Sequence, residues 1–387
     1  MCNHFLKRYQ GQSLGENPHI TVLGSCKVGN FVITIPLLRL LRKKYPNSTI
    51  DFWGSEITKD FEEALCGDGM PISWRYSWDY SKGNGSFKNV YESSMRREEK
   101  AGGIDLLINC DGFNPLTQTL ASWLRPKFVA GGSLDESCRN LLPWGEQANQ
   151  RFLADNDWDS ESFLFRYKNH FKSNYIAELF CRMAYLSPTL NDLSDINLPW
   201  KEPDFEVPDV LIHCTTARPA KLWPLKHWDE FITSFHNYSL KIGIIGASPK
   251  RQRSDYHAGN TEDELLKNHL GYVIDLRGKT NLIELAGASK KAKAVISLDA
   301  GPMHISAGVG TPTLAIVGND KNGEGVSPIR LWLPRSNCLD RTISSYTSTL
   351  FSKNNFKNDD QAEANRCMQG VEPNQVTNWL KRILGIK

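Results

Sequence analysis

The chain has 387 residues and carries 46 Lys plus Arg against 43 Asp plus Glu, a formal net charge of +3. This length suits two domains of ordinary size, and the balanced charge gives no general reason to expect a nucleic-acid partner. The nine Cys residues are scattered without a CxxC pair, which argues against a zinc site and favours reduced thiols inside a cell.

The N-terminus has no apolar signal core, and no run approaches the ~20 apolar residues of a membrane span. We therefore expect a cytoplasmic protein. The predicted helix at 31–45 carries Arg39, Arg42, Lys43 and Lys44, which suit either an anionic lipid or polysaccharide or an ordinary solvated face. Peripheral contact with the inner face of the cell membrane is thus left open.

Hydrophobic periodicity predicts alternating strands and helices in the first half of the chain. Strands are expected at 20–24, 50–54, 104–110 and 127–130, and helices at 31–45 and 116–124. A strand, a helix and a second strand form the βαβ unit of a parallel sheet. We expect residues 1–190 to form the first domain.

The same pattern restarts after a proline-rich segment. Residues 187–208 contain four prolines and no sustained helical period, so the linker is placed at 191–208. Residues 209–370 form the expected second domain, and 371–387 a terminal helix that could pack back on the first. Predicted strands lie at 210–214, 241–246, 273–276, 295–298 and 313–317, and predicted helices at 225–235, 282–289 and 373–384. Both halves therefore have the pattern of doubly wound α/β domains, whose ligands bind at the carboxyl ends of strands.

An anion site is predicted where a strand of the second domain turns into a helix, at Asp299-Ala300-Gly301-Pro302-Met303-His304. Gly301 permits close approach of the backbone, Pro302 suits the first helical turn, and free helix amides attract phosphate. Asp299 would repel phosphate, so it is expected to cap the helix or to accept hydrogen bonds from sugar hydroxyls. His304 could donate to a phosphate oxygen or pack against the sheet.

A second polar loop follows the strand expected beside that turn. Thr215 and Thr216 offer hydroxyls, and Arg218 and Lys221 offer positive charge, before a predicted helix. Taken alone, this pattern fits an ordinary polar surface loop as well as it fits a phosphate-binding loop. Beside the anion turn, it predicts the other half of a diphosphate clamp.

These motifs resemble glycosyltransferase family 9, the lipopolysaccharide heptosyltransferases. The resemblance runs from 28–38 through Thr215–Pro224 and Asp299–His304 to 367–373. It implies a GT-B fold, with two Rossmann-like doubly wound parallel-sheet lobes facing a central cleft. The N-terminal lobe would hold the acceptor and the C-terminal lobe the nucleotide sugar. It also implies an inverting reaction without a bound metal, no cofactor, and ADP-heptose as the expected donor.

By matching position, the resemblance places Thr215, Thr216 and Lys221 on the diphosphate. It places Asp299, Ala300, Gly301 and His304 around the phosphate and the donor sugar. Glu284 is a candidate for the ribose, but it fits equally well as an exposed helical residue or as the partner of Asn281 in a capping box.

One position departs from the family pattern. Asn30 stands where the family places the aspartate that deprotonates the acceptor hydroxyl, and an amide cannot take that proton. Asp111, at the end of a predicted strand, could act as base or could be an ordinary turn residue. Otherwise Asn30 positions the hydroxyl for a slow transfer, or the protein binds the donor without turnover.

Two further patterns carry less weight. The run 155–159 has the DxD spacing of metal-dependent glycosyltransferases and of calcium loops, but Ser160 and Arg166 replace the loop's glycine and glutamate, so it is interpreted as a solvated loop. The alternating aromatics fit either an acceptor platform or a half-buried strand, which is the commoner case. They are Trp74, Tyr76, Trp78 and Tyr80.

The sequence thus predicts an inverting glycosyltransferase that acts on a nucleotide diphosphate sugar and a hydroxyl of a lipopolysaccharide or other cell-surface glycan or glycolipid precursor. Two alternatives stay open: a sugar-nucleotide epimerase of the same fold, and a silent nucleotide-sugar-binding protein. The sequence makes no prediction about the oligomeric state.

Overall fold

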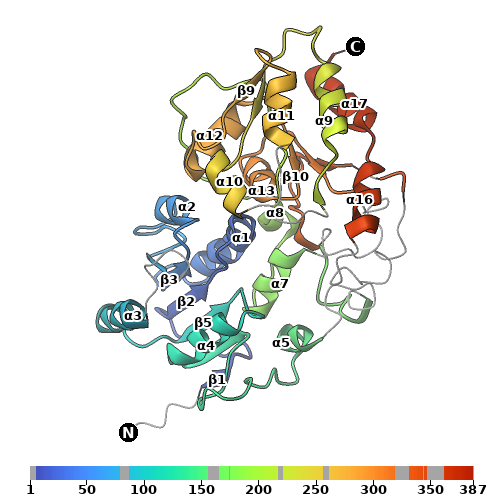
Figure 1. The fold of residues 1–387 in the computed structure, drawn as a ribbon. Coiled ribbons are helices and arrows are strands. Elements are labelled where there is room, and N and C mark those ends of the chain that lie inside the picture. Colours follow the sequence, from blue (N-terminus) through green and yellow to red (C-terminus); the bar gives the residue numbers. More distant parts are fainter. Residues whose placement is uncertain are drawn as a thin grey trace. The chain divides into compact units, whose positions relative to one another are not determined.

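The computed structural model describes residues 6–78, 87–155, 165–173, 175–216, 221–255, 261–318, 331–342, 344–346 and 361–386. The chain divides into two compact units that part between Leu193 and Ser194, within the segment 191–208. Each unit contains one parallel sheet (Figure 1). Within the described residues, no helix combines the length and apolarity of a bilayer span.

The sheet of the first unit has the strand order β1-β6-β5-β2-β3-β4. Its strands are β1 (Lys7–Arg8), β2 (His19–Leu23), β3 (Thr49–Gly54), β4 (Trp74–Ser77), β5 (Leu106–Asn109) and β6 (Phe128–Gly131). Its α-helices are α1 (Val28–Lys44), α2 (Lys59–Ala64), α3 (Phe87–Ala101), α4 (Pro115–Trp123), α5 (Ala148–Arg151), α7 (Ile176–Met183) and, at the unit boundary, α8 (Leu190–Ser194).

The sheet of the second unit has the order β12-β11-β10-β7-β8-β9. Its strands are β7 (Val210–His213), β8 (Ile242–Ile244), β9 (Val273–Asp275), β10 (Ala294–Leu298), β11 (Thr313–Ile316) and β12 (Leu339–Arg341). Its helices are α9 (Leu225–Thr233), α10 (Pro249–Asp255), α11 (Thr261–Asn268), α12 (Leu282–Lys291), α13 (Gly301–Gly308), α16 (Gln361–Gln369) and α17 (Pro373–Leu384).

In each sheet, the direction in which the chain adds new strands reverses at one place. In the first unit β1 lies at the edge beside β6; the chain then builds outward from β2 through β3 to β4 and returns to place β5 on the other side of β2. In the second unit β10 returns to the free side of β7 in the same way. These are the switch points at which doubly wound sheets bind ligands. The predicted α/β class, with two doubly wound parallel sheets, is confirmed.

The strands are continuous apolar runs because helices cover both faces of each sheet. All residues of β2 and β10 are buried. In the second unit, α9, α11 and α17 contribute to the core on one face, and Met303 of α13 packs with Ala315 and Val317 in a separate cluster.

The C-terminal helix α17 belongs to the second unit. Its buried residues Val376, Trp379 and Leu380 join the core with Trp228 and Phe231 of α9. Figure 1 shows α9 and α17 side by side. The apolar face of this helix is thus buried within the second unit, and its packing back on the N-terminal domain stays a prediction.

Candidate functional site

The switch point of the second unit brings the two predicted phosphate loops together. β7 and β10 pair in parallel, with His213 opposite Ser297, so the loops that follow them leave the same edge of the sheet. The ammonium group of Lys221 donates a hydrogen bond to the Asp299 carboxylate and thereby joins the two loops. Residues 217–220, including Arg218, lie outside the described part of the chain.

The N-terminus of α13 is open at this point. Ala300 is the N-cap residue in an extended conformation, and no side-chain hydrogen bond caps the helix. Pro302 lies in its first turn, as predicted, and the Met303 amide bonds back to the Ala300 carbonyl at 3.1 Å. Helix amides without a cap are available to an anion. The Asp299 carboxylate, which precedes this N-cap residue, pairs with Lys221.

His304 is buried in this first turn with 5% exposure. Burial lowers its pKa to about 4, the nearby Lys221 charge acts in the same direction, and Asp299 opposes it. The ring is therefore neutral at neutral pH. Its Nδ1 atom has no hydrogen-bond partner in the described structure. Burial fits the packed histidine, and an unpartnered nitrogen fits the ligand role.

Thr215 and Thr216 are both buried directly after β7. The Thr215 hydroxyl lies 3.3 Å from Nε2 of His213, and burial lowers the pKa of His213 to about 4. A neutral imidazole therefore lies behind Thr215. The Thr215 hydroxyl is thus held at the end of β7, as a preformed anion site requires.

Glu284 forms the capping box that the sequence left open as its alternative role. Its backbone N–H donates to Asn281 at 2.9 Å, and its carboxylate accepts from the Asn281 N–H at 3.2 Å. A second, looser contact of 3.8 Å joins it to Lys201. None of these contacts reaches the loops around Lys221 and Asp299.

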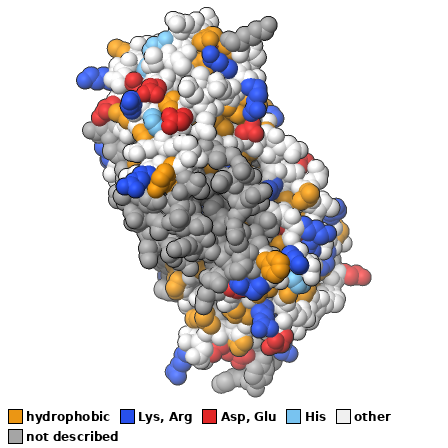
Figure 2. All heavy atoms as spheres, turned by 90° about the vertical axis from the view of Figure 1, so that its right-hand side faces the viewer, with side chains coloured by type: hydrophobic (Ala, Val, Ile, Leu, Met, Phe, Trp, Pro, Cys, Tyr) orange, Lys and Arg blue, Asp and Glu red, His pale blue; other side chains and the backbone are white. Residues whose placement is uncertain are grey.

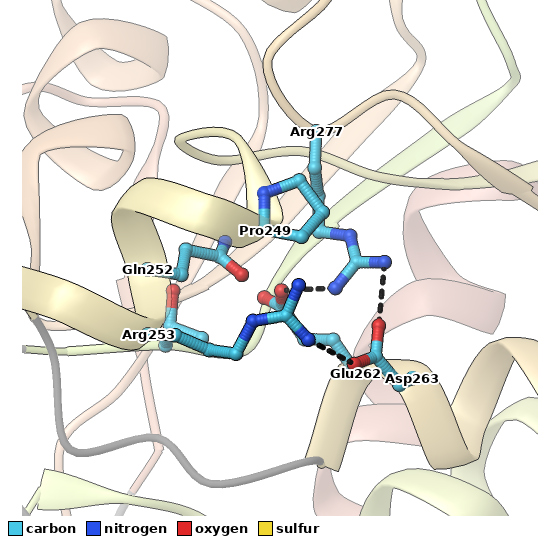
Figure 3. Close-up of a pocket in the computed structure, with 7 residues that line it drawn as sticks. Pro249, Gln252, Arg253, Glu262, Asp263 and Arg277 are labelled. Carbon is cyan, nitrogen blue, oxygen red and sulfur yellow. Dashed lines mark hydrogen bonds and ion pairs between the residues drawn. The ribbon is translucent and has the colours of Figure 1, made fainter.

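A small polar pocket lies beside Thr215, at the carboxyl ends of β7, β8 and β9, and was not predicted. It is centred on Arg277, which forms two 2.9 Å hydrogen bonds with Asp275 and one of 2.9 Å with Asp263, and reaches Glu262 at 3.2 Å. In Figure 3, Arg277 points toward the carboxylates of α11. The lining residues are Thr215, Pro249, Gln252, Arg253, Glu262, Asp263 and Arg277.

Nε2 of Gln252 and Oε1 of Glu262 are buried side by side in this pocket without a hydrogen bond of ordinary geometry, although Gln252 interacts with the Glu262 carboxyl group and acts to lower its pKa. One is a donor and the other an acceptor when ionised. Burial raises the pKa of Glu262 to about 7 although Arg277 opposes the shift, because Arg277 is shared with other carboxylates.

The switch point of the first unit carries Asn30 and Asp111. β2 and β5 pair in parallel, with Leu23 opposite Asn109, so the residues that follow both strands share one edge. Burial raises the pKa of Asp111, while its hydrogen bond of 2.9 Å from Asn114 and the Lys27 charge lower it. A carboxyl group with a raised pKa is a better base than an ordinary aspartate.

Asn30 lies in the first turn of α1 and is partly exposed. Its backbone carbonyl accepts a hydrogen bond of 2.8 Å from the Thr34 hydroxyl. Trp78 supports the same edge, because its indole N–H donates to the Gly24 carbonyl at 3.1 Å. The structure thus places both candidate catalytic residues at one end of the sheet.

The alternating aromatics form a half-buried strand. Trp74 and Tyr76 of β4 stack with their ring centroids 5.8 Å apart, and both rings pack against Trp53 of β3. Trp78, which follows β4, is buried. They belong to the core under α3 and α4. Tyr80 lies outside the described residues.

Other predicted charges have local roles. Arg42 bonds to the carbonyls of Met70, Pro46 and Ser48, so it ties α1 to its neighbours. Asp155 pairs with Arg166, and 156–164 lie outside the described part of the chain. Within the described ranges, no group of three or more His, Cys, Asp or Glu residues could hold a metal. Basic and acidic side chains are interspersed on the described face shown in Figure 2.

Comparisons with known proteins find similar sequences. The sequence model of glycosyltransferase family 9 (heptosyltransferase) fits residues 184–339, which include both phosphate loops. Lipopolysaccharide heptosyltransferase 2 of Escherichia coli is 22% identical over 77% of this chain and 82% of its own length. Lipooligosaccharide heptosyltransferase 2 of Haemophilus influenzae is 30% identical, but the match covers 26% of this chain and only 28% of that protein.

Solved structures support the fold. A glycosyl transferase family 9 protein from Veillonella parvula has a TM-score of 0.68 at 18% identity, over 97% of this chain and 99% of that one. The ADP-heptose lipopolysaccharide heptosyltransferase II of E. coli has a TM-score of 0.63 at 16% identity, over 95% and 98%.

The fold is therefore of GT-B type. The resemblance to glycosyltransferase family 9 is confirmed, and the domain that matches the family carries the Lys221 and Asp299 loops.

Proposed function

We propose that this protein is an inverting glycosyltransferase that moves a sugar from a nucleotide diphosphate sugar to a hydroxyl of a cell-surface glycan or glycolipid precursor. The observation that carries the proposal is the uncapped N-terminus of α13 beside Lys221, at the switch point of the second sheet. Relatives named as lipopolysaccharide heptosyltransferases suggest a heptose donor and a lipopolysaccharide acceptor.

In this proposal the diphosphate binds between the Thr215–Thr216 loop and the Ala300–Gly301 turn. The α13 amides and the Lys221 ammonium group supply positive charge to the leaving diphosphate, so no bound metal is required for that task. His304 is neutral and can donate one hydrogen bond to a phosphate oxygen. The nucleoside end would extend toward the Arg277 pocket, which adjoins Thr215.

The acceptor hydroxyl attacks the anomeric carbon from the face opposite the diphosphate. The bond between that carbon and the phosphate oxygen breaks as the new glycosidic bond forms, which inverts the configuration. Asp111 takes the proton of the hydroxyl, and Asn30 orients that hydroxyl by hydrogen bonding. The raised pKa of Asp111 supports this division of roles.

The Asn30 substitution favours one second candidate, a protein that holds nucleotide sugar without consuming it. The two are separated by incubating the purified chain with ADP-heptose and lipopolysaccharide that lacks its heptoses, followed by mass spectrometry of the acceptor. An added heptose supports transfer. An unchanged acceptor with calorimetrically bound donor supports the silent binder, and an altered sugar nucleotide without acceptor points to epimerisation.

The same assay tests metal independence. Transfer that persists after treatment with EDTA is expected if Lys221 and the helix amides serve the leaving group. Activity that disappears with EDTA and returns with a divalent cation would contradict this part of the proposal.

A further inference from the structure

We infer that Asp299 makes the donor site select an intact nucleotide diphosphate sugar over the free nucleoside diphosphate that transfer releases. This inference rests on the proposed function and concerns the same site. It assigns Asp299 a specificity role beyond binding the donor sugar.

The starting observation is that an acid lies inside a site built for an anion. Asp299 directly precedes the N-cap of α13, and its carboxylate accepts the hydrogen bond from Lys221. The two side chains are 13% and 22% exposed, so solvent screens their charges only in part. A diphosphate bound at the α13 amides must therefore share Lys221 with Asp299.

The two ligands differ in charge where Asp299 lies. In the intact donor, the second phosphate is esterified by the sugar and carries one negative charge. In the free diphosphate, that phosphate has an additional ionisable oxygen with a pKa of about 6, so it is more negative at neutral pH. A fixed carboxylate repels the free diphosphate more strongly than the ester.

The two ligands also differ in hydrogen bonding. Asp299 has acceptor capacity on two oxygens, and only the intact donor brings sugar hydroxyls that can donate to them. When the sugar is transferred, the hydrogen bonds from its hydroxyls to Asp299 are lost, and the second phosphate gains negative charge. Asp299 thus weakens binding of the product relative to the donor, which favours product release.

The test compares calorimetric dissociation constants for ADP, the β-methyl ester of ADP, and ADP-heptose. The methyl ester has the charge of the donor but no sugar, so it separates repulsion from sugar contacts. In the parent, ADP should bind about tenfold more weakly than its methyl ester. In Asp299→Asn, binding of ADP should tighten about tenfold more than binding of the methyl ester, which carries less charge, and ADP-heptose should bind more weakly because its sugar loses an acceptor.

Asp204→Asn is the matched control, because Asp204 is an exposed acid of the same unit and loses the same charge. It should leave all three constants unchanged. Asp299→Asn with the same ADP to methyl ester ratio as the parent would overturn the inference. If that variant does not fold, equal binding of ADP and its methyl ester to the parent overturns it as well.

Failure of the proposed function looks different. In that case none of the three ligands binds the parent, or all bind equally well to Lys221→Ala. Binding that requires Lys221 but ignores the charge at position 299 would retain the donor site and refute only the selectivity.

Discussion

The Lys221 ammonium group is hydrogen-bonded to the Asp299 carboxylate, so one ion pair bridges the loops that follow β7 and β10. Because these strands flank the switch point of the sheet, the pair lies where doubly wound domains bind their ligands. The cation is positioned before any donor arrives.

Lys221→Ala should weaken binding of ADP and ADP-heptose by about 10- to 100-fold, the usual range for a charge-assisted hydrogen bond. The loss also leaves Asp299 without its counter-charge, which adds repulsion. Lys226→Ala is the control, since Lys226 is 83% exposed and pairs with Glu230 on the surface of α9. Titration calorimetry measures both variants, and equal affinities would remove Lys221 from the site.

Asp111→Asn should lower kcat by about 10²- to 10⁴-fold if Asp111 is the general base, with donor affinity unchanged. Adding Asn30→Asp to this variant should restore part of the turnover, because it supplies a carboxylate in the first turn of α1, the helix that follows the adjacent strand β2. Steady-state transfer to the acceptor measures both effects.

Glu99→Gln, an exposed position on α3, is the control for loss of a carboxylate in the same unit. Turnover of Asp111→Asn equal to that of the control would exclude Asp111 as base. Failure of Asn30→Asp to raise the turnover of Asp111→Asn would mean that position 30 does not face the reacting hydroxyl.

Much of the fold could be predicted because parallel strands covered on both faces are continuous apolar runs. The runs at 210–214 and 295–298 correspond to β7 and β10. Their alternation with helices sufficed to place Thr215 and Asp299 at the same edge of one sheet. Glu284 shows the limit, since a glutamate three residues after Asn281 fits a capping box or a ligand, and only the structure distinguishes them.

The Arg277 pocket could not be predicted. Thr215, Gln252, Glu262 and Arg277 come from four separate segments, and each contributes one polar side chain without a recognisable spacing. Helices α10 and α11 are short and rich in charge, so they show no clear apolar period between the predicted strands at 241–246 and 273–276. The pocket depends on tertiary packing of these helices.

Stability should fall with rising pH because of Glu262. Its pKa is about 7 in the folded protein against an ordinary 4.5, so between these values the folded state keeps a proton that the unfolded state has released. Raising the pH across this interval should lower the free energy of unfolding by up to about 3 kcal/mol, with no further loss above pH 7.

Glu262→Gln should remove this loss, since Arg277 keeps its bonds to Asp275 and Asp263. Urea unfolding at pH 5, 6, 7 and 8 measures the effect, with the exposed Glu264→Gln of the same helix as control. Parallel pH profiles for the parent and Glu262→Gln would show that the carboxyl group is already ionised at low pH.

Gly287→Ala should destabilise the second unit by about 1 to 3 kcal/mol, the usual cost of overpacking. Gly287 lies inside α12, where alanine normally favours the helix, but a Cβ atom there would lie 1.8 Å from the Lys201 backbone carbonyl oxygen. That backbone cannot simply retreat, because the Lys201 N–H bonds to the Ile283 carbonyl of the same helix at 3.0 Å. Gly103→Ala meets no atom within 4 Å and should be nearly neutral. Thermal unfolding by calorimetry compares the two, and a Gly287→Ala melting temperature at or above that of Gly103→Ala would mean that the segment ending at Lys201 does not pack on α12.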